Sequence, residues 1–398
     1  MEYKWKAMFT VWIGMFMATL DGSIVNVALP TLTEYFKTDI TTIEWVVMAY
    51  LLTITSLLLS LGRISDMTGR KMIFAGGLAI FTIGSGLCAI SATENQLIFY
   101  RVLQGIGAAM LMATGIAIIT HAFPPRERGK AMGLIGTVVA IGSMAGPVAG
   151  GFLIENVGWQ SIFYINIPVG IFGTAMALTV LRKDETTSGQ TFDIPGALAL
   201  FISLMALLLA LSQGQESGWL SSYIILLFVL SIVFIIIFIR IETKAKQPMM
   251  ELHNFRNRPF AAANISALIN FTALYNVILL MPFFLQNELR YTPEEVGIIF
   301  LAVPLVMSVV SPLSGWLSDR TNSFLLSSIG IGISSVSILW LGFLSPTSGS
   351  IDVVLRLALL GLGMGLFVAP NNSIIMGALC STRLKGGAVR EEAHSLLA

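Results

Sequence analysis

The sequence predicts an all-α polytopic membrane protein, and three observations lead to that prediction. Of its 398 residues, 55% are apolar and only 11% carry a charge, which is about half the charged share of a typical soluble domain. The mean hydropathy is +0.83, and twelve apolar runs are long enough to cross a bilayer. This composition excludes a cytosolic enzyme, a nucleic-acid-binding protein and a disordered chain, since the polar surface is too small to cover a soluble fold.

The twelve runs are the predicted spans. A bilayer core about 30 Å thick is crossed by roughly 20 apolar residues in a helix. The first run follows two lysines, as a signal peptide would, but it lacks an Ala-x-Ala cleavage site and is long enough to span, so we expect it to be retained. The runs are residues 7–29, 43–62, 72–92, 97–120, 131–154, 160–181, 194–212, 219–240, 260–285, 295–317, 324–344 and 351–375.

The basic residues predict the orientation, because they prefer cytoplasmic loops. With the amino terminus inside, nineteen of the 23 Lys and Arg residues lie on the inner side. Only Lys37 and Arg290 face outside, while Arg101 and Arg356 lie within spans. The inner residues are Lys4, Lys6, Arg63, Arg70, Lys71, Arg126, Arg128, Lys130, Arg182, Lys183, Arg240, Lys244, Lys246, Arg256, Arg258, Arg320, Arg383, Lys385 and Arg390.

Two pairs of markers indicate a duplicated unit. The pattern Gly-x-x-Ser-Asp at residues 62–66 recurs at 315–319, 253 residues later, and Arg101 recurs as Arg356 at an offset of 255. The matched spans are eight apart, whereas a directly duplicated six-helix unit would place them six apart. Two inserted helices explain the difference. The pair at 194–240 is the obvious candidate, because its second member shows no polar stripe and such helices usually face lipid.

Four segments then carry a resemblance to a known family. Residues 62–71 resemble the loop signature of the major facilitator superfamily, and residues 101–107 resemble its fourth-helix motif. Residues 142–151 resemble the fifth-helix motif of its antiporters. Residues 20–30 are similar to the first-helix signature of the fourteen-helix drug:proton antiporters. The motifs occur in the family's order and on the expected spans, between residue 7 and about residue 375.

The resemblance implies a two-bundle fold and a function. We expect a first six-helix bundle at 1–181, an inserted helix pair with its loops at 182–258, a second bundle at 259–375 and a cytoplasmic tail at 376–398. The family would act in the cell membrane, exporting small lipophilic molecules or drugs by alternating access against inward proton flow. It needs the proton gradient but no cofactor, metal or nucleic acid, and the oligomeric state stays open.

The carboxyl-terminal region departs from the family pattern. Residues 376–398 contain no span-length apolar run, so the second bundle is expected to have four helices, with no partners for Arg356, Asn371 and Asn372. A non-functional truncated transporter is therefore the alternative function, and residues 376–398 are open to a shifted reading frame. A membrane enzyme is less favoured, because no catalytic cluster is found.

Asp21 and Arg101 are the candidates for proton coupling. An ionisable side chain at a helix centre costs roughly 2.5–3.5 kcal/mol on insertion scales, so its presence calls for a reason. Asp21 would bind the transported proton; the alternative is a polar anchor bonded to Asn26 or Tyr50. Arg101 stays charged and would link proton occupancy to conformation; the alternative is an arginine that reaches the outer headgroups.

The candidate cytoplasmic gate follows the second span. Gly62 and Gly69 would allow tight turns, and Asp66 would meet a helix amino end in the other bundle or pair with an arginine. Arg70 and Lys71 complete the motif, although these basic residues also serve to fix topology. Gly315, Asp319 and Arg320 repeat the gate motif in the second half, and Arg356 there repeats Arg101.

The antiporter motif lies in the fifth span. Gly142, Gly146 and Gly150 recur every four residues and make one smooth helical face, next to Gly151. Pro147 lacks a backbone N–H, which predicts a bend. Such a face is either a static packing seam or a seam along which a transporter rocks.

Overall fold

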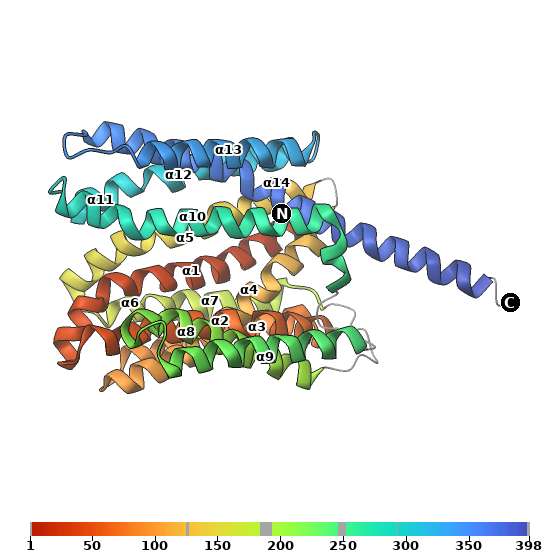
Figure 1. Cartoon of the computed structure of the whole chain (residues 1–398), viewed down its shortest axis with the longest axis horizontal. Helices are drawn as coiled ribbons and strands as arrows, with labels where there is room; N and C mark the ends of the chain where they lie inside the picture. The colour runs from red at the N-terminus through yellow and green to blue at the C-terminus, as the bar shows by residue number, and fades with distance from the viewer. Residues whose placement is uncertain (1, 125–126, 184–192, 246–251, 292, 396–398) are drawn as a thin grey trace. The chain divides into compact units, whose positions relative to one another are not determined.

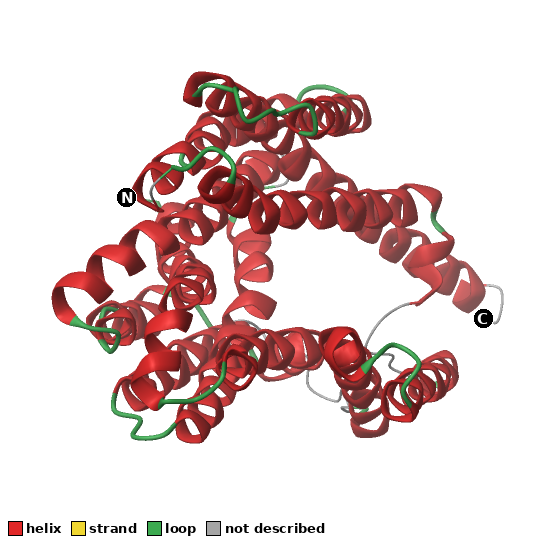
Figure 2. Ribbon diagram, turned by 60° about the vertical axis from the view of Figure 1, so that its left-hand side comes forward, coloured by secondary structure: helices red, strands yellow, loops and turns green. Residues whose placement is uncertain are grey.

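The computed structural model describes residues 2–124, 127–183, 193–245, 252–291 and 293–395. In this part of the chain the secondary structure is helical, with short loops between the helices (Figure 2). Twelve of the described helical segments are long and apolar enough to cross a membrane. The predicted count of twelve spans is confirmed, and the protein is a multi-pass membrane protein with an all-helical fold.

Figure 1 labels the helices in chain order. They are α1 (Tyr3–Phe36), α2 (Ile40–Thr68), α3 (Arg70–Ala89), α4 (Glu94–Ala122), α5 (Arg128–Val157), α6 (Ser161–Tyr164), α7 (Asn166–Val180), α8 (Ile194–Ser217), α9 (Ser222–Lys244), the short 3-10 helix η2 (Leu252–Arg256), α10 (Arg258–Asn287), α11 (Pro293–Phe300), α12 (Ala302–Ser318), α13 (Ser323–Leu341) and α14 (Ser350–Ser395).

Local sequence signals set both ends of α2, and they correct the expectation that Gly62 makes a turn. Asp39 caps the start of the helix, since its Oδ1 accepts the Thr42 N–H at 2.7 Å. The helix continues to Thr68, so Gly62 lies inside it and not at a turn, and the expectation for Gly62 is wrong. The turn itself is made by Gly69, whose φ of 101° is a backbone conformation that glycine adopts readily.

The helices form two compact units, each described here by itself. Unit 1 comprises Met1–Ala122 and Ala149–Glu251, and unit 2 comprises Phe123–Val148 and Leu252–Ala398. The division falls within α5, which contributes its first part to unit 2 and its last turns to unit 1. The inserted pair α8 and α9 groups with unit 1. The boundaries expected at residues 181, 258 and 375 remain predictions.

Glycines bring the helices of unit 1 close together. A Cβ atom on Gly107 of α4 would overlap the backbone of α3 at Phe81, and one on Gly84 of α3 would overlap the backbone of Gln104. These two helices therefore approach backbone to backbone, which requires small residues at the contact. The same close approach places Gln104 of α4 within hydrogen-bonding distance of Ser85 of α3, at 2.9 Å.

The inserted helix pair is not entirely apolar where its members meet. Ser203 of α8 donates to the carbonyl of Ser231 of α9 at 2.9 Å, and both residues are buried. Ser212 of α8 lies against the sulfur of Met48 of α2. One serine on each helix thus makes a polar contact between the two members of the pair.

Unit 2 satisfies polar groups that were expected to lack partners. Arg356 of α14 donates from Nε and Nη2 to the carboxylate of Asp352, one turn earlier, at 3.0 and 2.6 Å. Asn371 donates to the carbonyl of Ala263 at 3.1 Å. For these two residues the expectation is wrong, because the carboxylate lies on the same helix and the carbonyl acceptor on neighbouring α10. The helix α14 itself runs to Ser395.

Candidate functional site

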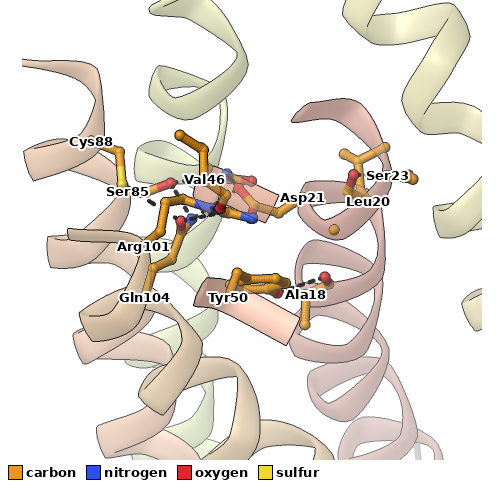
Figure 3. A network of polar contacts seen from close by, with 12 residues as sticks. Ala18, Leu20, Asp21, Ser23, Val46, Tyr50, Ser85, Cys88, Arg101 and Gln104 are labelled. Carbon is orange, nitrogen blue, oxygen red and sulfur yellow. Dashed lines mark hydrogen bonds and ion pairs between the residues drawn. The ribbon is translucent and has the colours of Figure 1, made fainter. Parts of the chain in front are cut away.

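A buried ion pair lies in the middle of unit 1. Arg101 of α4 donates from Nη1 to Oδ2 of Asp21 on α1, and neither side chain exposes any surface. The Nε of Arg101 donates to the carbonyl oxygen of Val46 on α2 at 2.9 Å. Figure 3 shows the Asp21 carboxylate and the Arg101 guanidinium facing each other between their helices. The two residues that the sequence analysis names as candidates for proton coupling thus form one ion pair.

Three further polar side chains complete the site. Gln104 Nε2 and Asn166 Nδ2 each donate to Asp21 Oδ1, at 2.8 and 2.9 Å. Both amides also donate to Ser85 Oγ, at 2.9 and 3.0 Å. Gln104 Oε1 accepts from Arg101 Nη1 at 2.6 Å, which fixes the orientation of its amide. The Asp21 carboxylate therefore accepts hydrogen bonds from side chains of α4 and α7.

Asp21 and Arg101 do not make the contacts that their alternative interpretations require. Arg101 is fully buried, so it does not extend to the headgroups. Asn26 donates to the Gly22 carbonyl on its own helix, and the Tyr50 hydroxyl donates to the Ala18 carbonyl at 2.8 Å; neither bonds to Asp21. The Tyr50 ring instead lies 4.0 Å from the Arg101 guanidinium carbon, as a cation–π contact.

This arrangement makes the carboxylate a charge-compensated anion at membrane depth. A buried charge is tolerated only when it is paired and hydrogen-bonded, and here both conditions hold. Protonating Asp21 would remove the negative charge that compensates Arg101.

Sequence reasoning missed Ser85, Gln104 and Asn166 as site residues. An uncharged amide or hydroxyl in a span is less costly than a charge, so single residues of this kind give a weak signal. The available signal was position: Gln104 follows Arg101 by three residues and therefore lies on the same helical face. Asn166 lies 145 residues from Asp21 in sequence, and only the fold brings them together.

The gate motif of the first half is held by contacts within unit 1. Arg70 donates to Asp66 Oδ1 from Nη2 at 2.8 Å and from Nε at 3.2 Å. Lys71 donates from Nζ to the carbonyl of Leu178, near the end of α7, at 2.6 Å. The expected arginine partner of Asp66 is thus on the next helix, α3, four residues along the chain.

The repeated motif in unit 2 makes the contact that was expected for Asp66. The Asp319 carboxylate accepts the backbone N–H groups of Gly129 and Lys130, at 3.0 and 3.3 Å. These two N–H groups belong to the first turn of α5, where a helix favours a negative charge. A Cβ on Gly315 would overlap the carbonyl of Gly129, so glycine lets the two helices meet. Partial desolvation raises the pKa of Asp319, against the lowering effect of the two N–H donors.

The other second-half residues have separate roles. Arg320 stacks on Trp316, with 4.1 Å between the guanidinium carbon and the ring centroid. Arg356 repeats the position of Arg101 but pairs with Asp352 on its own helix. The helix α10, which corresponds to α1, contains no acidic residue between Arg258 and Asn287. The buried pair between two helices is therefore a property of the first half.

The antiporter motif lies on α5, and its three spaced glycines are buried. A Cβ on Gly150 would approach the Ile24 side chain of α1 to 2.9 Å, whereas one on Gly151 would meet open space. Gly150 therefore packs tightly on α1, three residues from Asp21, and Gly151 does not. The side chain of Pro147 lies outside the described residues.

Unit 2 also carries an open groove of about 550 Å³ along α10. Its exposed aromatic side chains are Phe271 and Tyr275, with Thr272 and Asn276 as polar neighbours. All of its lining residues belong to α10, so it is an open surface along one helix that combines apolar side chains with a few polar groups.

Comparison with known proteins places the chain in a family. The sequence matches the Major Facilitator Superfamily over residues 11–388. It is 38% identical to the riboflavin transporter RibZ of Clostridioides difficile, over 94% of this chain and 81% of that protein. The chain belongs to the Major Facilitator Superfamily. The resemblance of the four sequence motifs is thereby confirmed at the level of the superfamily.

Two further relatives of this superfamily member are a multidrug resistance protein and a multidrug transporter protein. It is 32% identical to the multidrug resistance protein Stp of Mycobacterium tuberculosis, covering 93% of this chain and 69% of that protein. It is also 32% identical to the multidrug transporter protein MdtP of Bacillus subtilis, covering 89% of this chain and 65% of that protein. Among solved structures, the human organic anion transporter MFSD10 (TETRAN) matches with a TM-score of 0.67 at 13% identity, over 94% and 85% of the two chains. That likeness shows a shared fold.

Proposed function

We propose that this member of the superfamily exports small lipophilic molecules in exchange for protons. The observation that carries the proposal is the buried pair of Asp21 and Arg101. A carboxylate at membrane depth marks a proton or ion pathway by default, and its pairing with a permanent charge ties protonation to a rearrangement. In this proposal the proton gradient drives transport without a bound cofactor, and the chain lies in the cell membrane with its amino terminus in the cytoplasm.

The proposed mechanism is alternating access with a gate at one end of the helices. In this mechanism the Asp319 carboxylate holds the amino end of α5 in one state and releases it in the other. The bond is suited to this role because it joins an exposed side chain to two backbone donors, and such contacts are individually weak. The glycine face of α5 would then be the seam along which helices move.

We further propose that the chain is of the fourteen-helix drug:proton antiporter type. The first-helix signature around Asp21 supports this, as does the helix pair α8 and α9 between residues 194 and 244. The drug-transporter relatives support the substrate class. The groove on α10 would receive flat lipophilic molecules, with Phe271 and Tyr275 stacking on them and Thr272 or Asn276 donating hydrogen bonds.

Riboflavin is the second candidate substrate. The observation that favours it is the 38% identity to a riboflavin transporter over 94% of this chain. A flavin combines a flat aromatic ring system with a polar side chain, so the same aromatic and polar groups of the α10 groove suit it. Proton coupling at Asp21 would be common to both candidates.

The test is transport by the purified chain in vesicles. Riboflavin and a panel of lipophilic dyes are offered with and without an imposed proton gradient, in both directions. Gradient-dependent movement of dyes alone supports drug export, and movement of riboflavin alone supports the second candidate. If no compound responds to the gradient while the protein is folded and inserted, the proposal of proton coupling is wrong.

A further inference from the structure

A polar pocket of about 200 Å³ lies in unit 1, away from the buried pair. Its walls come from the start of α1, the start of α3, the end of α4 and the end of α7. Four helices therefore begin or end at this pocket. Its lining residues are Tyr3, Lys71, Ile118, His121, Ala122, Leu181 and Arg182.

Two permanent positive charges are held at fixed places in this pocket. The Lys71 ammonium donates to the Leu178 carbonyl at 2.6 Å, which anchors it beside the end of α7. The Arg182 guanidinium lies over the Tyr3 ring, 4.3 Å from its centroid. The backbone N–H of Arg182 also points to the Tyr3 hydroxyl, at 3.4 Å. Both cations are thus positioned by neutral partners.

Among the residues that the structure describes, no acidic side chain compensates the charge of the pocket. A carbonyl and an aromatic ring orient a cation but do not cancel its charge, and none of the seven lining residues is acidic. Neither Lys71 nor Arg182 forms an ion pair with a described residue. His121 adds a third basic group to the same wall. The pocket is therefore built to receive an anion.

The depth of the pocket selects the kind of anion. Two of the helical segments at the pocket, Arg70–Ala89 and Ser161–Val180, are each 20 residues long. That length crosses a hydrocarbon core about 30 Å thick, so the ends of these segments lie beside the phospholipid headgroups. Tyrosine and basic residues are enriched at this depth, and basic pockets between transmembrane helices bind anionic headgroups. A guanidinium presents a fork that matches two phosphate oxygens, while an ammonium acts as a point charge.

We infer that this pocket binds a phosphate group, supplied by an anionic phospholipid of the adjacent leaflet. Lys71 and Arg182 hold the phosphate oxygens, and the Tyr3 hydroxyl is a further donor. Inorganic phosphate has the same chemistry and is the alternative source. The inference does not depend on transport or on the state of Asp21.

The experiment measures lipid binding to the full chain, purified in a neutral detergent. Native mass spectrometry counts bound phosphatidylglycerol, with phosphatidylcholine as the zwitterionic lipid and inorganic phosphate as a competitor. The pocket variant is Lys71→Gln with Arg182→Gln. The matched control is Lys183→Gln with Lys244→Gln, which removes two exposed positive charges of unit 1 that lie outside the pocket.

The expected result is that phosphatidylglycerol affinity falls by roughly tenfold or more in the pocket variant, since two charge-assisted contacts are lost, and stays unchanged in the control. Equal loss in both variants, or no loss in either, overturns the inference. Phosphate binding that is lost in the pocket variant, without preference for phosphatidylglycerol, overturns the lipid source and supports the phosphate chemistry. If the pocket variant does not fold, Lys71→Arg with Arg182→Lys must keep the binding and Arg182→Gln alone must weaken it.

Discussion

Asp319 accepts the backbone N–H of Gly129 at 3.0 Å, so a carboxylate from the repeated Gly-x-x-Ser-Asp motif closes the amino end of α5. The equivalent residue of the first half, Asp66, pairs with Arg70 instead. The two copies of one motif thus make two different contacts within their units. This difference leads to a prediction for the second copy.

We predict that Asp319→Ala lowers the free energy of unfolding by about 1 kcal/mol, the usual cost of losing a helix cap. Asp319→Asn should keep the cap, because an amide oxygen also accepts the Gly129 N–H. The folded-state pKa of Asp319 is raised by desolvation, so the ionised carboxylate is less stable in the folded chain than in the unfolded one. The stability that this protonation equilibrium gives the folded chain is fully present below pH 3.8, the ordinary pKa of the carboxyl group. It is lost as the pH rises through the raised pKa of the folded state.

The measurement is the thermal unfolding of the unmodified protein and both Asp319 variants in detergent, from below pH 3.8 to neutral pH. The Asn variant should match the unmodified protein at low pH and equal or exceed it at neutral pH. An Asn variant that loses as much stability at neutral pH as the Ala variant would show that the carboxylate charge itself stabilises α5.

Gly107 is expected to be intolerant of any side chain. A Cβ at this position would overlap the backbone N of Phe81 and the carbonyl of Gly77, so Gly107→Ala must separate α3 from α4. We predict a loss of about 1–3 kcal/mol, as for other overpacked positions. Gly151→Ala is the control, because its Cβ meets open space and alanine is the better helix former. Unfolding of both variants in detergent is compared; equal stability would contradict the close approach.

The buried pair should show strong coupling in a double-mutant cycle. Removing one partner of a buried ion pair leaves an uncompensated charge and typically costs about 3–5 kcal/mol. We therefore expect Asp21→Asn and Arg101→Gln each to be strongly destabilising, and the double variant to be less destabilised than the sum of the two. Additive effects would mean that the two side chains do not interact in the membrane.

The orientation can be checked by labelling single cysteines at exposed positions of unit 1, in a background without Cys88 and Cys380. The Thr41 hydroxyl donates to Glu216 at 3.2 Å, so residues 37 and 216 should lie at one end of the unit. Tyr3 and Arg182 mark the other end. Because basic residues prefer the cytoplasm, we predict that Lys37→Cys and Glu216→Cys react from outside. Lys183→Cys and Lys244→Cys should react only after permeabilisation; the opposite pattern would invert the topology.

The span count could be predicted from sequence because the length of an apolar run reports directly on its ability to cross a bilayer. The helix ends could not be predicted from sequence, because polar residues at the membrane interface can either continue a helix or form the loop that follows it. Residues 62–68 of α2 are the example: they contain Arg63 and Asp66, yet they stay helical until Gly69. The sequence also could not predict which helices share a compact unit, because that depends on how the helices pack. The division within α5 is the example.

The candidate site was predictable in its charges and not in its geometry. Asp21 and Arg101 were each conspicuous, because an ionisable residue in an apolar run is rare. Their pairing joins residues 80 positions apart and depends on how α1, α2 and α4 pack. Ser85 and Asn166 carry no charge and lie on other helices, so only the assembled unit shows that they hold the same carboxylate.

The central claim is that Asp21 couples protons to transport, and Asp21→Asn tests it most directly. Substrate movement driven by an imposed proton gradient is measured in vesicles, together with substrate binding in the absence of a gradient. Asp352→Asn is the matched control, because it makes the same chemical change in the arginine pair of unit 2. We predict that Asp21→Asn abolishes gradient-driven transport while binding remains measurable, and that Asp352→Asn retains the gradient response. Full gradient-driven transport by the Asp21→Asn variant would contradict the account.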